Sequence, residues 1–179
     1  MKLQSIAVLA AILVALVGIY LVTNRMQIPV EAERLPFVWQ FAPDTLTRVS
    51  VSLMREGKAE TWVRRGENDW VFEASGDAVD EARWGLGIPL LLSGPRAARI
   101  VGDVESARLD AYGLAAPRVT IGLDLADGRK VTAYVGDITP DGAEDYVTVE
   151  GSPVVYSVSR EWAGVAERLV HQPPVAPLP

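Results

Sequence analysis

The sequence has no cysteine, and it has only one histidine among its 179 residues. Without cysteine there can be no disulfide, no thiolate metal site and no cysteine nucleophile. The single histidine, His171, opens a proline-rich tail, where an acid–base role would need positioned partners and a solvated side chain is the ordinary state. Phosphate-binding glycine motifs and a Gly-x-Ser-x-Gly elbow are also missing. We therefore predict no catalytic residue, no cofactor and no enzyme activity.

A basic surface is missing as well. The formal net charge is −6, whereas a protein that binds nucleic acid through its phosphates needs clustered lysine and arginine. Nucleic acid is therefore excluded as a partner. Two small basic clusters, at residues 64–65 and 96–99, are interpreted as solvated surface, with an anionic lipid or an acidic partner face as the alternative.

Charge is absent from residues 6–22, a long apolar run between Lys2 and Arg25. A helix over residues 5–23 would be about 30 Å long, which matches the hydrocarbon core of a bilayer. A cleavable signal peptide is the competing interpretation, but its apolar region would be shorter, with small residues close behind. The pattern predicts an uncleaved transmembrane anchor at residues 1–25, with Lys2 favouring a cytoplasmic N-terminus.

Small residues recur along this predicted helix at a spacing that puts them on one face. Such a face lets a second helix approach closely. It predicts a helix-packing interface at Ala7, Ala11, Ala15 and Gly18.

Residues 26–44 contain three prolines, which disfavour a helix and predict an extended linker. Its aromatic side chains are unusual for a free linker. They predict an interfacial or partner-binding segment at Phe37, Trp39 and Phe41.

Residues 45–170 carry the periodicity of a β-rich domain. Strands are predicted at 48–53, 59–65, 70–73, 98–101, 118–123, 130–135, 145–150 and 153–157. Helices are predicted from Asp77 or Asp80 to Leu92 and over 160–170, with a helical turn at 105–109. Because residues 118–123 echo residues 48–53, the pattern predicts an α+β domain of two strand-strand-strand-helix repeats. Residues 171–179 form the proline-rich tail.

A run of turn glycines and aromatic residues across Leu46 to Arg168 resembles the DUF4340 family of bacterial envelope domains. The residues that carry the resemblance are Trp70, Tyr112-Gly113-Leu114-x-x-Pro117, Leu125-x-x-Gly128, Val135-Gly136, Tyr146-Val147 and Val155-Tyr156. The resemblance implies a domain tethered by one N-terminal helix and related to auxiliary components of gliding-motility-type ABC transporters. It implies no catalytic residues. This chain has a single copy of the run, where some relatives have several.

Four acidic side chains gather at residues 137–145, namely Asp137, Asp141, Glu144 and Asp145. Their spacing does not match a calcium loop, so a solvated acidic loop is favoured over a weak cation site.

These features favour a non-catalytic, single-pass accessory subunit of a larger bacterial membrane complex. Its partners would be other membrane subunits and the lipid bilayer, in the inner membrane, with the domain in the periplasm. The alternative is a module that binds an envelope ligand or serves a transporter.

Overall fold

The computed structural model describes residues 35–66, 69–85, 87–104 and 109–177, together with Leu13, Leu16, Gly18 and Tyr20. Leu35–Pro179 forms one compact unit, and Met1–Arg34 forms another. The four described residues of the first unit have helical backbone and exposed side chains. All the strands and helices named below belong to the second unit.

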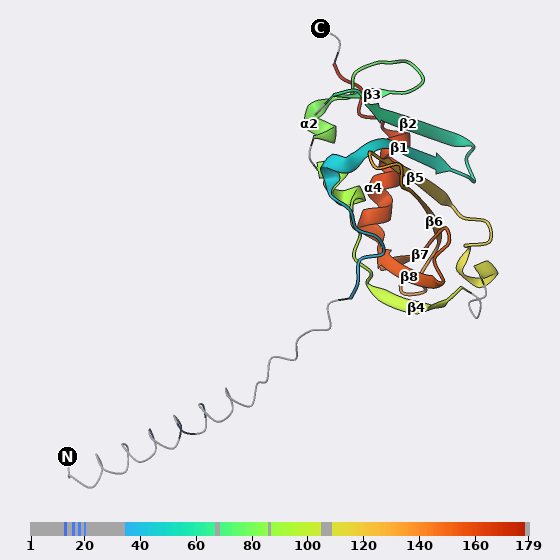
Figure 1. Ribbon diagram of the computed structural model, residues 1–179. Coiled ribbons are helices and arrows are strands. Elements are labelled where there is room, and N and C mark those ends of the chain that lie inside the picture. The colour runs from blue at the N-terminus through green and yellow to red at the C-terminus, as the bar shows by residue number, and fades with distance from the viewer. Residues whose placement is uncertain are drawn as a thin grey trace. The chain divides into compact units, whose positions relative to one another are not determined.

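Eight strands of the described residues form one antiparallel sheet in the order β3-β2-β1-β5-β6-β7-β8-β4 (Figure 1). The strands are β1 (Leu46–Leu53), β2 (Lys58–Arg64), β3 (Trp70–Phe72), β4 (Arg99–Asp103), β5 (Val119–Leu125), β6 (Lys130–Ile138), β7 (Glu144–Val149) and β8 (Val154–Ser159). The helices are α2 (Glu81–Trp84), α3 (Gly87–Leu92) and α4 (Arg160–His171), with 3-10 turns η1 (Pro43–Thr45) and η2 (Leu109–Tyr112).

The two segments that echo each other in sequence are neighbours at the centre of this sheet. Strand β1 pairs with β5 in antiparallel register, with Val51 opposite Ile121 and Val49 opposite Leu123. All four side chains are fully buried, because alternate residues of each strand face the core. Residues that alternate in this way are the signal that predicted both strands.

The predicted arrangement in two repeats is wrong. One continuous sheet replaces two helix-covered units, and β4 lies beside β8 at the far edge instead of following β3. The helix predicted up to Leu92 is two short helices, α2 and α3, with Gly85 between them in a positive-φ conformation that ends α2. Only α4 has the length expected of a covering helix.

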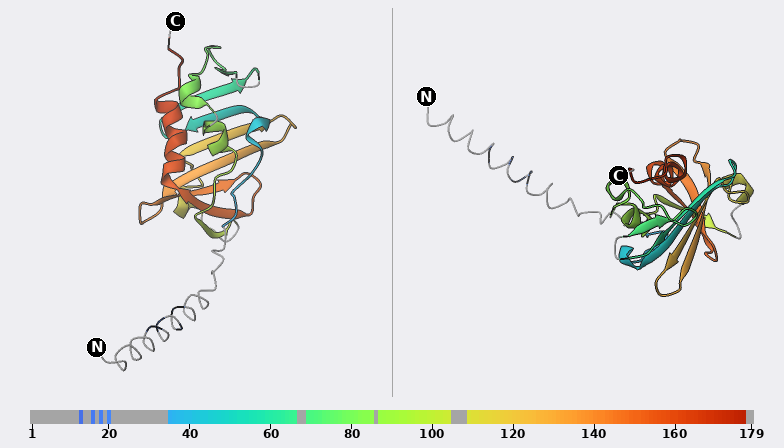
Figure 2. Two further views of the ribbon diagram at one scale, coloured as in Figure 1. Left: turned by 90° about the vertical axis from the view of Figure 1, so that its left-hand side faces the viewer. Right: turned by 90° about the horizontal axis from the view of Figure 1, so that it is seen from above.

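Helix α4 begins where predicted and lies across one face of the sheet (Figure 2). The Ser159 hydroxyl caps its N-terminus by accepting a hydrogen bond from the Glu161 amide. Its apolar side chains pack onto the core face of the strands, and they are Trp162, Ala163, Ala166, Leu169 and Val170. The prolines that follow Gln172 cannot continue the helix, so the chain leaves it there.

Two of the motifs that carry the family resemblance meet in the fold. Gly136 in β6 lies against the Tyr112 carbonyl, where a Cβ atom would clash. Gly113 follows with φ of 68°, a conformation that glycine adopts without strain. These two glycines therefore allow the η2 turn to lie directly on the sheet, which is a structural role.

The transmembrane helix in the predicted architecture is also corrected. No helix among the described residues is long and apolar enough to cross a membrane. Apart from the four residues named above, Met1–Arg34 lies outside the described residues.

Candidate binding site at the β4 end of the sheet

A charged cluster of three side chains lies where β4 meets the turn between β6 and β7. Arg99 opens β4, Asp141 lies in the turn, and Glu144 opens β7. The Arg99 Nε atom donates to Glu144 Oε2 at 2.9 Å, and its Nη2 atom donates to Asp141 Oδ2 at 2.9 Å. The two carboxylates therefore hold the guanidinium from two sides, and the cluster carries a net charge of −1.

The turn itself fixes the position of Asp141. The Asp141 Oδ1 atom accepts hydrogen bonds from the Thr139 hydroxyl at 2.6 Å and the Ala143 amide at 3.2 Å. Gly142, with φ of 75°, supplies the left-handed residue that the turn requires. The hydrogen bond from Thr139, then those from Ala143 and Arg99, lower the pKa of Asp141 to about 2. Asp141 is therefore ionised at neutral pH.

Glu144 is held from beneath by a buried hydroxyl. Ser157 in β8 is 1% exposed, and its Oγ atom donates to Glu144 Oε2 at 2.6 Å. Ser157 is paired with Arg99 across β8 and β4 and with Tyr146 across β7 and β8. The ladder thus brings together residues that are far apart in sequence. The hydrogen bond to Glu144, followed by that to Asp141, raises the pKa of Arg99.

A surface cavity of about 410 Å³ opens over this cluster. Its polar wall is made by the three charged side chains with Thr139 and Ser157, and the rest of its lining is Ile100, Val101, Pro140 and Tyr146. The Tyr146 ring packs against the Tyr112 ring at an angle of 49°, with ring centroids 4.6 Å apart. The site combines fixed hydrogen-bonding groups with an apolar lining, as small-ligand sites do.

The predicted acidic loop does not gather its four acids around one point. Asp137 pairs with Arg55 at 2.7 Å, Asp141 and Glu144 pair with Arg99, and Asp145 pairs with Arg118 at 2.5 Å. Within the described part of the chain, no group of three histidine, cysteine, aspartate or glutamate side chains could hold a metal ion. Each acid is thus committed to an arginine.

Asp145 differs from the other three acids because it is buried. Its side chain is 1% exposed, and Arg118 links it to Glu167 of α4. Burial raises the pKa of Asp145, against the opposing effect of Arg118 and Arg160. This cluster joins β7 to the covering helix, and its position indicates a structural role.

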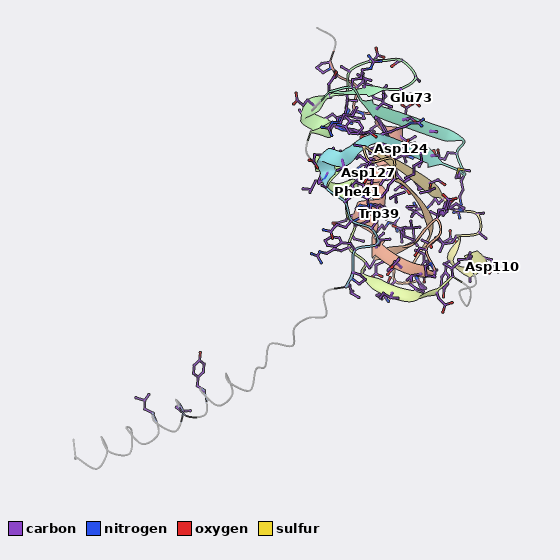
Figure 3. The ribbon with its side chains drawn as sticks, in the orientation of Figure 1. Trp39, Phe41, Glu73, Asp110, Asp124 and Asp127 are labelled. Carbon is purple, nitrogen blue, oxygen red and sulfur yellow. The ribbon has the colours of Figure 1, made fainter. Side chains whose placement is uncertain are left out.

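The predicted aromatic segment lies against the domain (Figure 3). Residues 36–41 pair with residues 93–97, and Phe41 packs against the core. Trp39 is 8% exposed, donates from Nε1 to the Leu92 carbonyl at 2.8 Å, and meets Trp162 edge-on. Phe37 lies under the Arg96 guanidinium, 4.3 Å from the ring centroid. A side chain as buried as Trp39 offers little surface to a partner.

The other candidate residues lie elsewhere. Ala7, Ala11 and Ala15 fall outside the described residues, and Gly18 is helical with no atom near the position of a Cβ. His171 ends α4, with its Nε2 atom 3.3 Å from Glu56 Oε1. His171 is not among the residues that line the cavity.

Sequence reasoning placed Arg99 in a solvated basic cluster and gave Ser157 no role. The signal that joins them is the pairing of β4 with β8, which spans more than fifty residues. A pattern of alternation predicts each strand but does not name its neighbour.

Comparison with family models, curated proteins and solved structures finds no match to this chain. The resemblance to the DUF4340 family therefore stays a hypothesis that rests on the residues quoted for it.

Proposed function

We propose that this chain is a non-catalytic accessory subunit whose domain docks on a partner protein through the β4 end of its sheet. The observation that carries the proposal is the difference between the two sheet edges. The β3 edge is covered by the chain's own residues, because Val71 bridges Ala78 and Val79 bridges Val175. Strand β4 ends the sheet at the other side, with Ile100 55% exposed.

Docking at β4 would use side chains more than main-chain pairing. Val101 is an extra residue in the ladder with β8, since Ile100 is opposite Tyr156 and Gly102 is opposite Val155. A bulge and flanking charges are the usual devices that prevent another strand from adding to an edge. The exposed Ile100 side chain and the rim of the cavity beside it remain as the contact surface.

We propose no catalysis because the serine that contacts a carboxylate at this site is too buried to reach a substrate. A serine nucleophile must reach its substrate, and it needs a base that receives its proton. Ser157 touches the Glu144 carboxylate, but its 1% exposure keeps the hydroxyl from a bound substrate. The predicted location in the periplasm stays a prediction.

A site-specific photo-crosslinker tests the docking surface. Benzoyl-phenylalanine at position 100 in the full chain is expected to give one discrete protein adduct in cells. The same group at position 175 is the matched control, because Val175 is 54% exposed at the opposite end of the sheet. Equal adducts at both positions, or none at position 100, would contradict docking at β4.

The cavity favours a second candidate function, that of a ligand-binding module. Its volume of about 410 Å³ falls within the range of roughly 300–1,000 Å³ that is typical of small-molecule sites. Native mass spectrometry of the purified chain would reveal a retained small molecule, whereas an accessory subunit is expected to travel with protein partners.

A further inference from the structure

We propose that the cavity at the β4 end binds a neutral saccharide, with two adjacent ring hydroxyls on Arg99 and Glu144. This site goes beyond docking on a protein and does not depend on it, because ligand binding can be measured on the isolated chain. The inference rests on the hydrogen-bonding capacity that remains in the charged cluster, on its charge, and on the lining of the cavity.

Arg99 and Glu144 present donors and an acceptor side by side. Arginine has five N–H donors, and the described residues use two of those of Arg99, one on Nε and one on Nη2. The Glu144 Oε2 atom accepts from both Arg99 and Ser157, while Oε1 accepts no hydrogen bond from a described residue. A ligand must therefore accept from a guanidinium and donate to a carboxylate at neighbouring positions.

Two adjacent ring hydroxyls meet this requirement, whereas a single trans peptide unit does not. A hydroxyl can donate and accept at the same time, so two adjacent ring hydroxyls can satisfy Arg99 and Glu144 together. In a trans peptide, the planar unit directs its N–H and C=O to opposite sides. A single backbone amide therefore cannot meet a donor and an acceptor that lie next to each other.

The charge of the cluster disfavours ionic ligands. Two ionised carboxylates repel a phosphate or carboxylate ligand from Arg99, and Arg99 itself lies between the carboxylates where a cation would bind. A neutral ligand escapes both penalties. Because the net charge of the cluster is negative, an anion fits less well than a cation or a neutral ligand.

The rest of the lining suits a sugar ring. Sugars expose C–H groups on the faces of the ring, and these need apolar or aromatic contacts. Tyr146, Pro140 and Val101 line the cavity beside the charged cluster. Because Thr139 and Ser157 already hold the two carboxylates, little side-chain freedom is lost when a ligand binds.

The same sheet offers a matched control. Arg48 in β1 also lies between two acids, with Glu73 Oε2 at 2.6 Å and Asp124 Oδ2 at 4.0 Å from its guanidinium. Its side chain is 42% exposed, against 56% for Arg99. Arg48 does not line the cavity, so Arg48→Ala removes a comparable ion pair and leaves the proposed site intact.

The test is a titration of the ¹⁵N-labelled full chain, followed by NMR. Glucose, N-acetylglucosamine and maltose serve as neutral probes, with inorganic phosphate and lysine methyl ester as ionic ones, all at millimolar concentrations. We expect a neutral sugar to shift the amide signals of Arg99, Val101, Asp141 and Glu144 and few others. Arg99→Ala and Glu144→Gln are each expected to weaken binding about tenfold, since each removes a hydrogen bond that involves a charged group.

Arg48→Ala should bind the sugar as the unchanged chain does. The proposal is overturned if no neutral sugar shifts these signals, if only an ionic probe shifts them, or if Arg48→Ala weakens binding as much as Arg99→Ala. Glu144→Gln keeps the shape of the side chain and guards against a loss caused by misfolding. Failure here leaves the crosslinking result at position 100 unaffected, so the two proposals can fail separately.

Discussion

The two ends of the sheet solve the problem of an exposed edge in different ways. At the β3 end, the chain covers its own edge with residues 78–79 and then with the C-terminal tail. At the β4 end, a bulge and charged side chains guard the edge, and a cavity opens beside it. The β3 end closes the fold, and the β4 end leaves polar groups available to a ligand or partner.

The side chains inside the two ends of the sheet also differ, since one end is aromatic and the other is charged. Behind β3, Trp62 and Trp70 each pack against Trp84, with ring centroids 5.0 and 5.2 Å apart. At the β4 end, arginine–carboxylate pairs take the place of such a cluster. Apolar burial contributes far more to stability than exposed ion pairs do. Stability is therefore concentrated at the β3 end, whereas the β4 end is where we propose recognition.

The largest loss of stability should come from replacing Trp62, which is fully buried at the β3 end. We expect Trp62→Ala to lower the free energy of unfolding by about 3–5 kcal/mol, because it leaves a large cavity. Trp62→Phe should cost less, since the Nε1 atom of Trp62 has no hydrogen-bond partner among the described residues. Urea denaturation measures both. A loss below about 1 kcal/mol in Trp62→Ala would show that the tryptophan cluster does not stabilise this end.

A smaller loss of stability is expected when residues 172–174 of the C-terminal tail are detached. Arg83 donates to the carbonyls of Gln172 at 2.7 Å and Pro173 at 3.0 Å, and the Asp80 amide donates to the Pro174 carbonyl at 2.7 Å. Arg83→Ala should lower stability by about 1 kcal/mol and raise amide exchange at Asp80. Arg129→Ala is the control, because the Arg129 side chain pairs with Asp127 in its own turn and with no other side chain among the described residues. Unchanged exchange at Asp80 would mean that the tail stays bound without Arg83.

Asp141 and Asp145 lie four residues apart, and their contributions to folding stability should change with pH in opposite directions. The pKa of Asp141 is lowered to about 2, so its contribution to stability is present above 3.8 and is lost as the pH falls towards 2. The pKa of Asp145 is raised, so the fold disfavours its charged form, and stability falls as the pH rises through 3.8 to the raised value. Urea midpoints of Asp141→Asn and Asp145→Asn across the acid range should diverge from the unchanged chain in opposite directions. Parallel profiles would contradict this difference in environment.

The smallest effect on stability should come from Arg99→Ala. Its side chain is 56% exposed, and solvent screens its ion pairs. We expect its urea midpoint to match that of the unchanged chain, while sugar binding in the cavity is weakened. A clear loss of stability would show that Arg99 holds the β4 end together, which would remove the distinction drawn between the two ends.

Much of the sheet could be predicted from local sequence. The alternation of apolar residues gave the central strands, and Asp127-Gly128 marked the hairpin, where Gly128 has φ of 86°. The strand order could not be predicted, because period-2 alternation specifies a face but not a partner. For the same reason, the pairing that brings Arg99 to Ser157 had no local signal.

The aromatic residues 37–41 show a different limit. The prolines of residues 26–44 predicted an extended linker, but residues 36–41 pair with residues 93–97, and this pairing depends on where α3 ends. Trp39 lies inward because the Leu92 carbonyl and the Trp162 ring are there to receive it. Neither partner is near Trp39 in sequence. Composition alone therefore predicted that these aromatic side chains face the membrane interface or a partner.

The hydrogen-bonded tail has a consequence for the order of events during synthesis. Helix α4 and the tail residues that pair with residues 78–80 follow all eight strands in the sequence, so a ribosome releases them after the strands. Until then, the nascent sheet lacks its covering helix, and residues 78–80 lack the tail that pairs with them. Domains generally fold as units while chains are being made, N-terminal parts first. This domain must therefore complete its core after its last strand has been made, and residues 78–80 are open to other chains in the interval.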